Sequence, residues 1–489
     1  MFTFIFSILA LIVGYFIYGK VTEKIFVINP DAKTPAYRLQ DGVDYVPMPT
    51  WKTTLIQLLN IAGTGPIFGA IAGALFGPAA FAWIVLGCIF AGAVHDYIVA
   101  MLSLRDDGAN IAEIVGKYLG KGPLYIMRVF SVVLLIFIGV VFVTTPAQVL
   151  QEMFAPGNMR FFYIVIVVVI AYYILATLLP IDKIIGRFYP VFGACLLIMA
   201  VGITVMMFFS GEIMRIPEFS FVNMMPNKDS SIMSKIFPFL FVTIACGAIS
   251  GFHSTQSPLM ARCIRNEKEG RMVFYGAMIL EGIIAMIWAA ATMAHFDVVG
   301  VENVVAAPVV VSQTARDYMG IIGGILAVFG VVAAPITSGD TAFRSARLAI
   351  ANIKNFDQKL IKNRLVIAIP LFTVGVALVL FAIASIENFN IIWRYFAWTN
   401  QTLATIGLWT ACVYLAKNGK QSLITLIPAI FMTAVVTTYF FTANECLGPL
   451  MTSFTGSEHV TYSIGLSIGI GLAITLSAFF ISRFGLKHK

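Results

Sequence analysis

Residues 237–262 read FPFLFVTIACGAISGFHSTQSPLMAR, and this stretch decides the fold of the 489-residue chain. It begins as an apolar membrane helix, but small and polar residues occupy its middle: Gly247, Ser250, Gly251, His253 and Ser254. An unpaired backbone group in hydrocarbon costs several kcal/mol, so such an interruption belongs where protein lines a polar cavity. We therefore expect a broken membrane helix here.

A second interruption, Asn60-Ile61-Ala62-Gly63-Thr64-Gly65-Pro66, lies earlier in the chain. Glycine permits unwound backbone, and proline removes a donor and disfavours helix at the preceding residue. Two interrupted helices in corresponding positions of two halves indicate the binding site of a transporter. Glycines that only permit close helix packing are the alternative.

The composition is that of a polytopic membrane protein. The chain is 59% hydrophobic and only 11% charged, whereas soluble proteins carry roughly 25% charged residues. The net charge of +8 resides in short loops, so the positive-inside rule explains it better than nucleic-acid binding. The six cysteines lack CxxC spacing, which favours small apolar side chains over disulfides or a metal site. Residues 1–18 lack a basic n-region and a cleavage site, so we expect an uncleaved first span.

Thirteen stretches approach the roughly 20 apolar residues that a span requires. They are about 2–18, 53–75, 79–103, 123–149, 161–180, 188–209, 236–261, 272–294, 321–346, 365–386, 391–415, 422–444 and 461–482. With the N-terminus outside, 25 of the 32 Lys and Arg residues lie in inside segments and 5 in outside segments; Arg128 and Arg394 lie within spans. This asymmetry predicts an outside N-terminus and an inside C-terminus.

In this frame spans 2–6 and spans 7–11 run in opposite directions, and each set opens with an interrupted helix. We predict an all-α membrane protein of the leucine-transporter type, with a 5+5 inverted repeat and two broken helices. Residues 53–209 form repeat one and residues 236–415 form repeat two. Residues 1–52 add an N-terminal helix and a cytoplasmic loop, and residues 422–489 add two C-terminal helices and a cytoplasmic tail.

The two breaks are the predicted substrate site. The half-helix that starts near Pro66 points its N-terminus at the gap and favours an anion, whereas carbonyl groups of the half-helix ending near Ala62 suit a cation. A substrate carboxylate is therefore the expected ligand. The two amides in span 11, Asn400 and Gln401, point to different faces, so one of them is expected to reach the cavity. The candidate substrate-binding residues are Gly63, Thr64, Gly65, Pro66, Gly247, Ser250, Gly251, Phe252, His253, Asn400 and Gln401.

Ionisable residues inside spans are candidates for coupling. An imidazole at His253 could carry a proton or bind a carboxylate, or it could be a hydrogen-bonded packing residue. Glu281 lies about 15 Å along span 8 by helical rise, near the midplane, and either carries a proton or makes a structural bond. His95 and Asp96 lack metal-ligand spacing, so a structural ion pair or a gate is expected.

A polar stretch at the end of span 9 supplies hard oxygen ligands for a small cation. The alternative pairs Asp340 with Arg344 or Arg347 on one helix face. The candidates for ion or proton coupling are Thr337, Ser338, Asp340, Thr341 and Glu281.

These motifs resemble those of the carbon starvation protein A family. The residues that carry the resemblance are 61–67 (IAGTGPI), 92–96 (GAVHD), 243–253 (TIACGAISGFH), 337–347 (TSGDTAFRSAR) and 400–401 (NQ). The resemblance runs from the first loop through span 11. It implies the amino acid–polyamine–organocation superfamily and inner-membrane import of peptides in starved bacteria, or of pyruvate with protons. This chain is shorter than the long members, chiefly at its C-terminal end, where the missing region could influence substrate choice.

The sequence therefore predicts a secondary active transporter that works by alternating access. Its partners are a peptide or small-molecule substrate and the lipid bilayer, with no nucleic acid, and it needs no cofactor besides a transported H⁺ or Na⁺. A channel and a membrane-embedded nutrient sensor are the alternatives. No nucleophile elbow and no HExxH motif occurs in the sequence, which argues against an enzyme.

Overall fold

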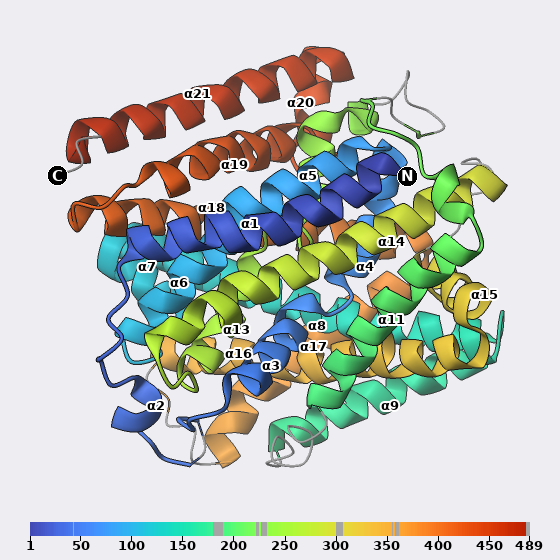
Figure 1. The fold of residues 1–489 in the computed structure, drawn as a ribbon, viewed down its shortest axis with the longest axis horizontal. Coiled ribbons are helices and arrows are strands. Elements are labelled where there is room, and N and C mark those ends of the chain that lie inside the picture. The colour runs from blue at the N-terminus through green and yellow to red at the C-terminus, as the bar shows by residue number, and fades with distance from the viewer. Residues whose placement is uncertain are drawn as a thin grey trace.

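The computed structural model describes residues 1–42, 44–178, 189–221, 224–225, 232–299, 307–354, 356 and 361–485. Every regular element in these residues is a helix, which confirms the predicted all-α class. The long helices α1, α14, α18, α19 and α21 run across the molecule in much the same direction (Figure 1).

The elements comprise α-helices and short 3₁₀ or π segments, labelled η. In chain order they are α1 (Phe2–Phe26), α2 (Pro35–Arg38), α3 (Thr50–Ala62), α4 (Gly65–Gly73), η1 (Ala74–Phe76), α5 (Ala79–Gly87), η2 (Cys88–Gly92), α6 (Ala93–Arg105), α7 (Ile111–Leu119), α8 (Lys121–Phe154), α9 (Met159–Leu178), α11 (Tyr189–Phe209), η3 (Glu212–Arg215), η4 (Ile232–Ser234), η5 (Ile236–Leu240), α12 (Phe241–Thr243), α13 (Gly251–Ala261), η6 (Glu267–Glu269), η7 (Arg271–Gly276), α14 (Ala277–Val299), α15 (Ala307–Ala327), η9 (Val328–Ala333), α16 (Ala334–Lys354), α17 (Ile361–Ala384), α18 (Ile386–Lys417), α19 (Leu423–Thr442), α20 (Gly448–Thr455) and α21 (Glu458–Phe484).

Ten helices in the described residues are long and apolar enough to cross a membrane, or eleven if the bent pair Thr50–Ala62 and Gly65–Phe76 is one span. These eleven coincide with eleven of the thirteen predicted spans. The other two predicted spans fall on α18 and on the segment from η5 to α13, both of which carry many polar residues. The end of the fifth predicted span and the start of the sixth lie outside the described residues.

Two helices differ from the predicted pattern. Span 9 was expected to begin at residue 321, but α15 is already helical from Ala307, and a bend at Gly320 (φ 57°) separates this arm from the rest. The loop predicted over residues 104–122 contains α7. A capping box in which Asn110 and Glu113 bond to each other's backbone N–H groups begins α7.

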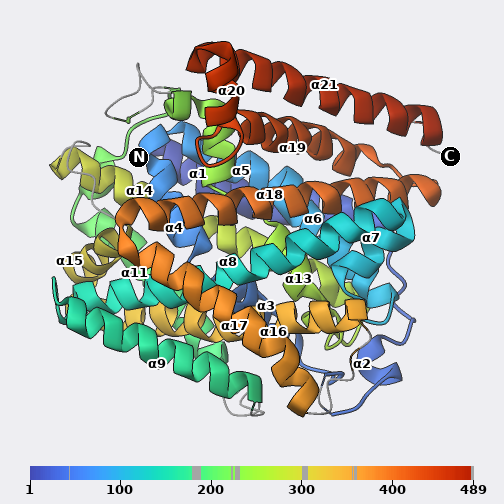
Figure 2. The same ribbon diagram turned by 180° about the vertical axis from the view of Figure 1, so that it is seen from behind.

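The burial of the spans separates a centre from a periphery. In the most apolar 18-residue stretches of spans 79–105 and 267–295, 83% of the residues are buried within the protein. In that of α21 only 22% are buried. Figure 2 shows α21 at one edge of the molecule, beyond α19. The peripheral helices expose apolar side chains to lipid, and the central ones are surrounded by protein, where a polar group can be satisfied.

Candidate functional site

The first break is short and is held by steric contact. Helix α3 ends at Ala62 and α4 begins at Gly65, with a bend of 49° between the two half-helices. Gly63 has φ 35°, and a Cβ atom there would lie 2.4 Å from the Phe142 ring, so only glycine fits. Thr64 is fully buried, and no described residue hydrogen-bonds its hydroxyl group. That hydroxyl is available to a ligand.

The second break is longer. Helix α12 ends at Thr243, and α13 begins at Gly251 after Ser250, whose backbone is extended (φ −140°, ψ 125°). The sequence places His253 and Ser254 within the interruption, so the break ends sooner than that pattern predicts. His253 lies in the first turn of α13 and not in unwound backbone, because the extended Ser250 acts as the N-cap residue and helical geometry resumes directly after it.

Both predicted amides bond to this second break. Oδ1 of Asn400 accepts hydrogen bonds from the backbone N–H of Phe252 (2.7 Å) and from the hydroxyl of Ser250 (3.1 Å). Nε2 of Gln401 donates to the backbone carbonyl of Phe241 at 2.8 Å. Helix α18 thus satisfies backbone groups on both sides of the break, as buried backbone requires.

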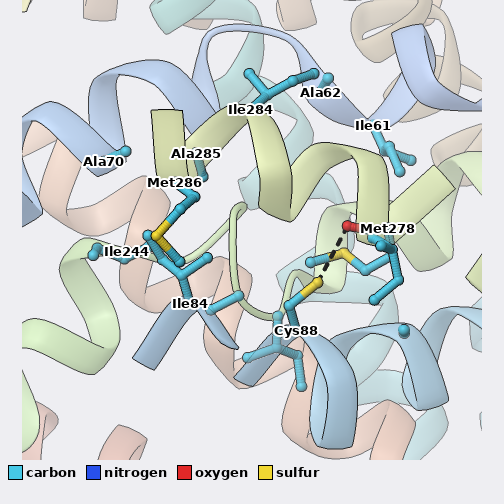
Figure 3. Close-up of a cluster of buried hydrophobic side chains, with 14 of the residues drawn as sticks. Ile61, Ala62, Ala70, Ile84, Cys88, Ile244, Met278, Ile284, Ala285 and Met286 are labelled. Carbon is cyan, nitrogen blue, oxygen red and sulfur yellow. Dashed lines mark hydrogen bonds between the residues drawn. The ribbon is translucent and has the colours of Figure 1, made fainter. Parts of the chain in front are cut away.

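The two breaks touch each other. Gly65, Gly69 and Gly73 form one face of α4. Cβ atoms on these residues would lie 2.4 Å from Sγ of Cys246, 3.1 Å from the Thr243 carbonyl and 2.2 Å from Ile244. Figure 3 shows Ala62 and Ala70 of the first broken helix in one buried cluster with Ile244 of the second and with Ala285 of α14. Small residues permit this approach, so the ends of the half-helices converge in one region. Gly247 faces α14, since its Cβ atom would lie 2.4 Å from Cβ of Ala285.

Four predicted residues meet in what we call the central cluster: His95 and Asp96 on α6, His253 on α13 and Glu281 on α14. Nδ1 of His95 lies 2.8 Å from one carboxylate oxygen of Asp96, and Nδ1 of His253 lies 2.7 Å from the other. Nε2 of His253 lies 3.2 Å from Oε2 of Glu281. None of the four side chains has exposed area. The sequence had assigned these residues to three separate roles.

The remaining coupling candidates lie on α16. The hydroxyl of Ser338 donates to the Leu59 carbonyl in the last turn of α3 (3.3 Å), whereas the hydroxyls of Thr337 and Thr341 bond within α16. Asp340 forms the ion pair that was the alternative to a cation site, since it lies 3.2 Å from the guanidinium of Arg344. It also accepts a hydrogen bond from the Tyr172 hydroxyl at 3.3 Å.

A cavity of about 340 Å³ lies between α8, α13 and α16. The charged residues of its lining are two arginines, Arg128 and Arg262, and one acid, Asp44. Arg128 was not predicted as a site residue, although it is one of the two basic residues inside predicted spans. The other, Arg394, pairs with Glu445 at 3.1 Å. The uncharged polar residues of the lining are Asn110, Ser131, Thr255 and Ser345.

Comparison with known sequences places this arrangement in a family. The model of the carbon starvation protein CstA family matches residues 1–178, 163–332 and 305–439. The chain belongs to this family. A membrane protein of Haemophilus influenzae is 47% identical over 337 residues, which cover 60% of this chain and 91% of that protein.

Named relatives in the family are transporters. The peptide transporter CstA of Bacillus subtilis is 25% identical, with 95% of this chain and 94% of the relative covered. The pyruvate/proton symporter BtsT of Escherichia coli is 25% identical over 57% of this chain and 47% of that protein. The chain is therefore a secondary transporter and not an enzyme.

Solved structures share the fold at low sequence identity. A manganese transporter of Eremococcus coleocola has a TM-score of 0.52 at 14% identity, with 91% of this chain and 99% of that chain covered. A Na⁺-coupled sialic acid symporter has a TM-score of 0.51 at 14% identity, with 96% and 97% covered. The predicted transporter-type membrane fold is confirmed.

Proposed function

We propose that this chain imports a carboxylate-bearing solute, either a short peptide or a small acid such as pyruvate, across the bacterial cytoplasmic membrane during carbon starvation. The convergence of the two breaks carries this proposal. Helices α4 and α13 both begin where the two breaks converge, and helix N-termini stabilise anions. The buried Thr64 hydroxyl adds a donor that no described residue uses. Family members named for peptide and for pyruvate transport support both substrate classes.

The cavity between α8, α13 and α16 supports a route from the breaks to the cytoplasm. In the proposed orientation, with the N-terminus outside and the C-terminus inside, its arginines lie toward the inner face and attract the carboxylate. The rings of Phe142 and Phe252, with centroids 6.4 Å apart, stand beside the first break. Alternating access would expose the breaks to each side in turn.

An ion gradient drives this import, with H⁺ or Na⁺ as the transported ion and no further cofactor. The contact between Ser338 and the Leu59 carbonyl supports a cation site, because hydroxyl and carbonyl oxygens are the ligands that hard cations prefer. Thr337, Thr341 and Asp340 stand on the same helix. In this scheme Asp340 contributes its carboxylate to coupling, although Arg344 holds it in the present state.

Uptake by purified protein in proteoliposomes tests the function. Labelled dialanine and labelled pyruvate are supplied separately, with a proton gradient or a sodium gradient imposed in turn. We expect one solute to accumulate above equilibrium under one gradient. Equilibration without accumulation would instead indicate a channel, and movement of neither solute would contradict the proposal.

Replacement of Asp340 by Asn should abolish gradient-driven uptake and leave a monodisperse protein. Asp317→Asn, at an exposed acid on α15, is the matched control and should transport normally. Unchanged accumulation by Asp340→Asn would remove Asp340 from the coupling scheme.

Arg128→Gln should weaken the apparent affinity for pyruvate by about tenfold, equivalent to about 1.4 kcal/mol. Arg160→Gln, at an exposed arginine at the start of α9, is the control. An unchanged KM in Arg128→Gln would exclude the cavity from the substrate route.

A further inference from the structure

The central cluster is a group of ionisable side chains that are all fully buried. Three helices build it from residues that are distant in the sequence: His95 and Asp96, His253, and Glu281. We propose that this cluster binds and releases the proton that drives transport, with Glu281 as the group that gains and loses it. This proposal rests on the proposed transport function and names its coupling ion.

The hydrogen bonds of Asp96 define the resting arrangement of protons. Each carboxylate oxygen of Asp96 faces one imidazole Nδ1, of His95 at 2.8 Å and of His253 at 2.7 Å. An ionised Asp96 accepts on both oxygens, so in the proposed resting arrangement each Nδ1 carries the N–H that donates to it. Nε2 of His253 lies 3.2 Å from Oε2 of Glu281, and the proposed resting arrangement assigns one further proton to this pair.

A charge count shows what a second proton does. With one proton between His253 and Glu281 and with His95 neutral, the cluster carries a net charge of about −1. A net charge that is fully removed from water is costly. One added proton converts the Glu281 carboxylate to a carboxylic acid while His253 stays protonated, and the cluster becomes neutral. The proton comes from water on one side and returns to water on the other, so atoms and charge balance.

Unused hydrogen-bonding capacity distinguishes this cluster from a structural network. Buried polar groups in structural networks are nearly always paired. Here Nε2 of His95 and Oε1 of Glu281 are buried, and no described residue hydrogen-bonds them. The contact between His253 and Glu281 has the distance of an ion pair without the alignment of a hydrogen bond. Glu281 therefore has a free oxygen to receive a proton.

The surroundings of the cluster contribute neutral groups. Sγ of Cys88 packs against Gly282, the residue after Glu281, and Sγ of Cys246 accepts from Ser250 and Asn400. Gln57 of α3 bonds to Ser257 one turn after His253, and Asn400 of α18 bonds to the break. Gly407 of α18 packs against Nε2 of His95.

Other buried carboxylates in the described residues have a guanidinium partner instead. Asp340 pairs with Arg344, and Glu445 with Arg394. A permanent cation holds a carboxylate ionised, whereas an imidazole can exchange its proton near neutral pH. The central cluster is thus suited to gain and lose a proton, whereas Asp340 would contribute to coupling as an ionised carboxylate.

The cluster is joined to the second break. His253 stands three residues after Ser250, in the first turn of α13, while Glu281 belongs to α14. Protonation of Glu281 removes the charge that attracts His253 and so weakens the bond between α13 and α14. The half-helix that borders the break can then shift, which couples proton binding to access.

Two assays on Glu281→Gln test the proposal. Gln mimics the protonated acid, so exchange of labelled for unlabelled solute, for dialanine and pyruvate separately, should persist. Proton-driven accumulation should fall at least about tenfold, within the usual range of coupling between sites. Glu281→Asp keeps a titratable group and should retain pH-dependent uptake with a shifted profile. Glu445→Gln, at a buried carboxylate outside the cluster, is the control and should retain proton-driven accumulation.

A spectroscopic readout separates failure of this inference from failure of the transport function. Infrared difference spectra of the wild-type protein across pH should show the carbonyl band of a protonated carboxyl group, and Glu281→Gln should lack it. Normal proton-driven accumulation in Glu281→Gln, or an unchanged band, would overturn the inference. If wild-type protein moves neither solute, the transport function fails, and the band alone decides whether the cluster binds a proton. If Glu281→Gln does not fold, Glu281→Asp and the wild-type band decide it.

Discussion

The two helix breaks pack against each other but are held in different ways. The first consists of Gly63 and Thr64, has no ionisable side chain, and is fixed by the Phe142 ring. The second runs from Ile244 to Ser250 and is bonded to α18. A break held by steric contact responds little to pH, whereas a break joined to the central cluster can respond to protonation. Two broken helices that pack against each other can therefore be held by different kinds of contact.

The largest effect is expected from Gly251→Val at the second break. A Cβ atom at residue 251 would lie 2.4 Å from the carbonyl oxygen of Asn400 and 2.5 Å from the backbone nitrogen of Ala404, so the backbone of α18 would have to move. We expect a loss of about 3 kcal/mol or more of stability, measured by yield and thermal unfolding. Gly122→Val has open space around it and should fold normally. A stable Gly251→Val protein would show that the contact with α18 is not needed.

Asn400→Leu should be the next most damaging change. It leaves the Phe252 N–H and the Ser250 hydroxyl without their acceptor, at a cost of about 1–3 kcal/mol. We expect lower thermal stability together with loss of uptake. Asn388→Leu, nearer the start of the same helix, is the control. Normal uptake in Asn400→Leu would mean that hydrogen bonding does not hold the second break.

Gly63→Ala tests the first break and should cost about 1–2 kcal/mol, because an L-residue is strained at positive φ. The Cβ atom also overlaps the Phe142 ring, so Phe142→Leu in the same chain should recover part of the loss. The loss should be equal at pH 6 and pH 8. A loss of stability that differs between the two pH values would show that the first break also responds to pH.

Glu218→Gln is the baseline for the comparison, since it touches neither break. Hydrogen bonds from the Thr3 hydroxyl and from the Met1 ammonium hold the pKa of Glu218 at about 2, below its ordinary 4.5. The stabilisation is therefore complete above about pH 4.5 and is lost as pH falls toward 2. Exposed ion pairs contribute only about 0.2–1 kcal/mol. The thermal unfolding temperature of the wild-type protein should fall between pH 5 and pH 3. In Glu218→Gln this dependence of the unfolding temperature on pH should be smaller. An identical dependence in both proteins would show that Glu218 is not its source.

The sequence alone determined the class of fold and the location of the breaks. The membrane restricts backbone to helices, so apolar length reveals the spans, and an interruption by Gly63 or Ser250 reveals a break in a helix. These patterns are local in the sequence, so they can be interpreted without knowledge of the packing. The extent of the second break was predicted less accurately. Asn400 of the distant helix α18 accepts a hydrogen bond from the Phe252 N–H, and this contact helps to decide where α13 begins.

Only the tertiary structure decided which ionisable groups lie together. His95 and Asp96, His253 and Glu281 come from three helices and carry no shared motif, so their contacts arise from the packing of α6, α13 and α14. The partner of Asp340 illustrates the opposite case: Arg344 is four residues away on one helix, and helical periodicity predicted that alternative. Contacts within a helix follow from spacing, whereas contacts between helices depend on how their faces pack.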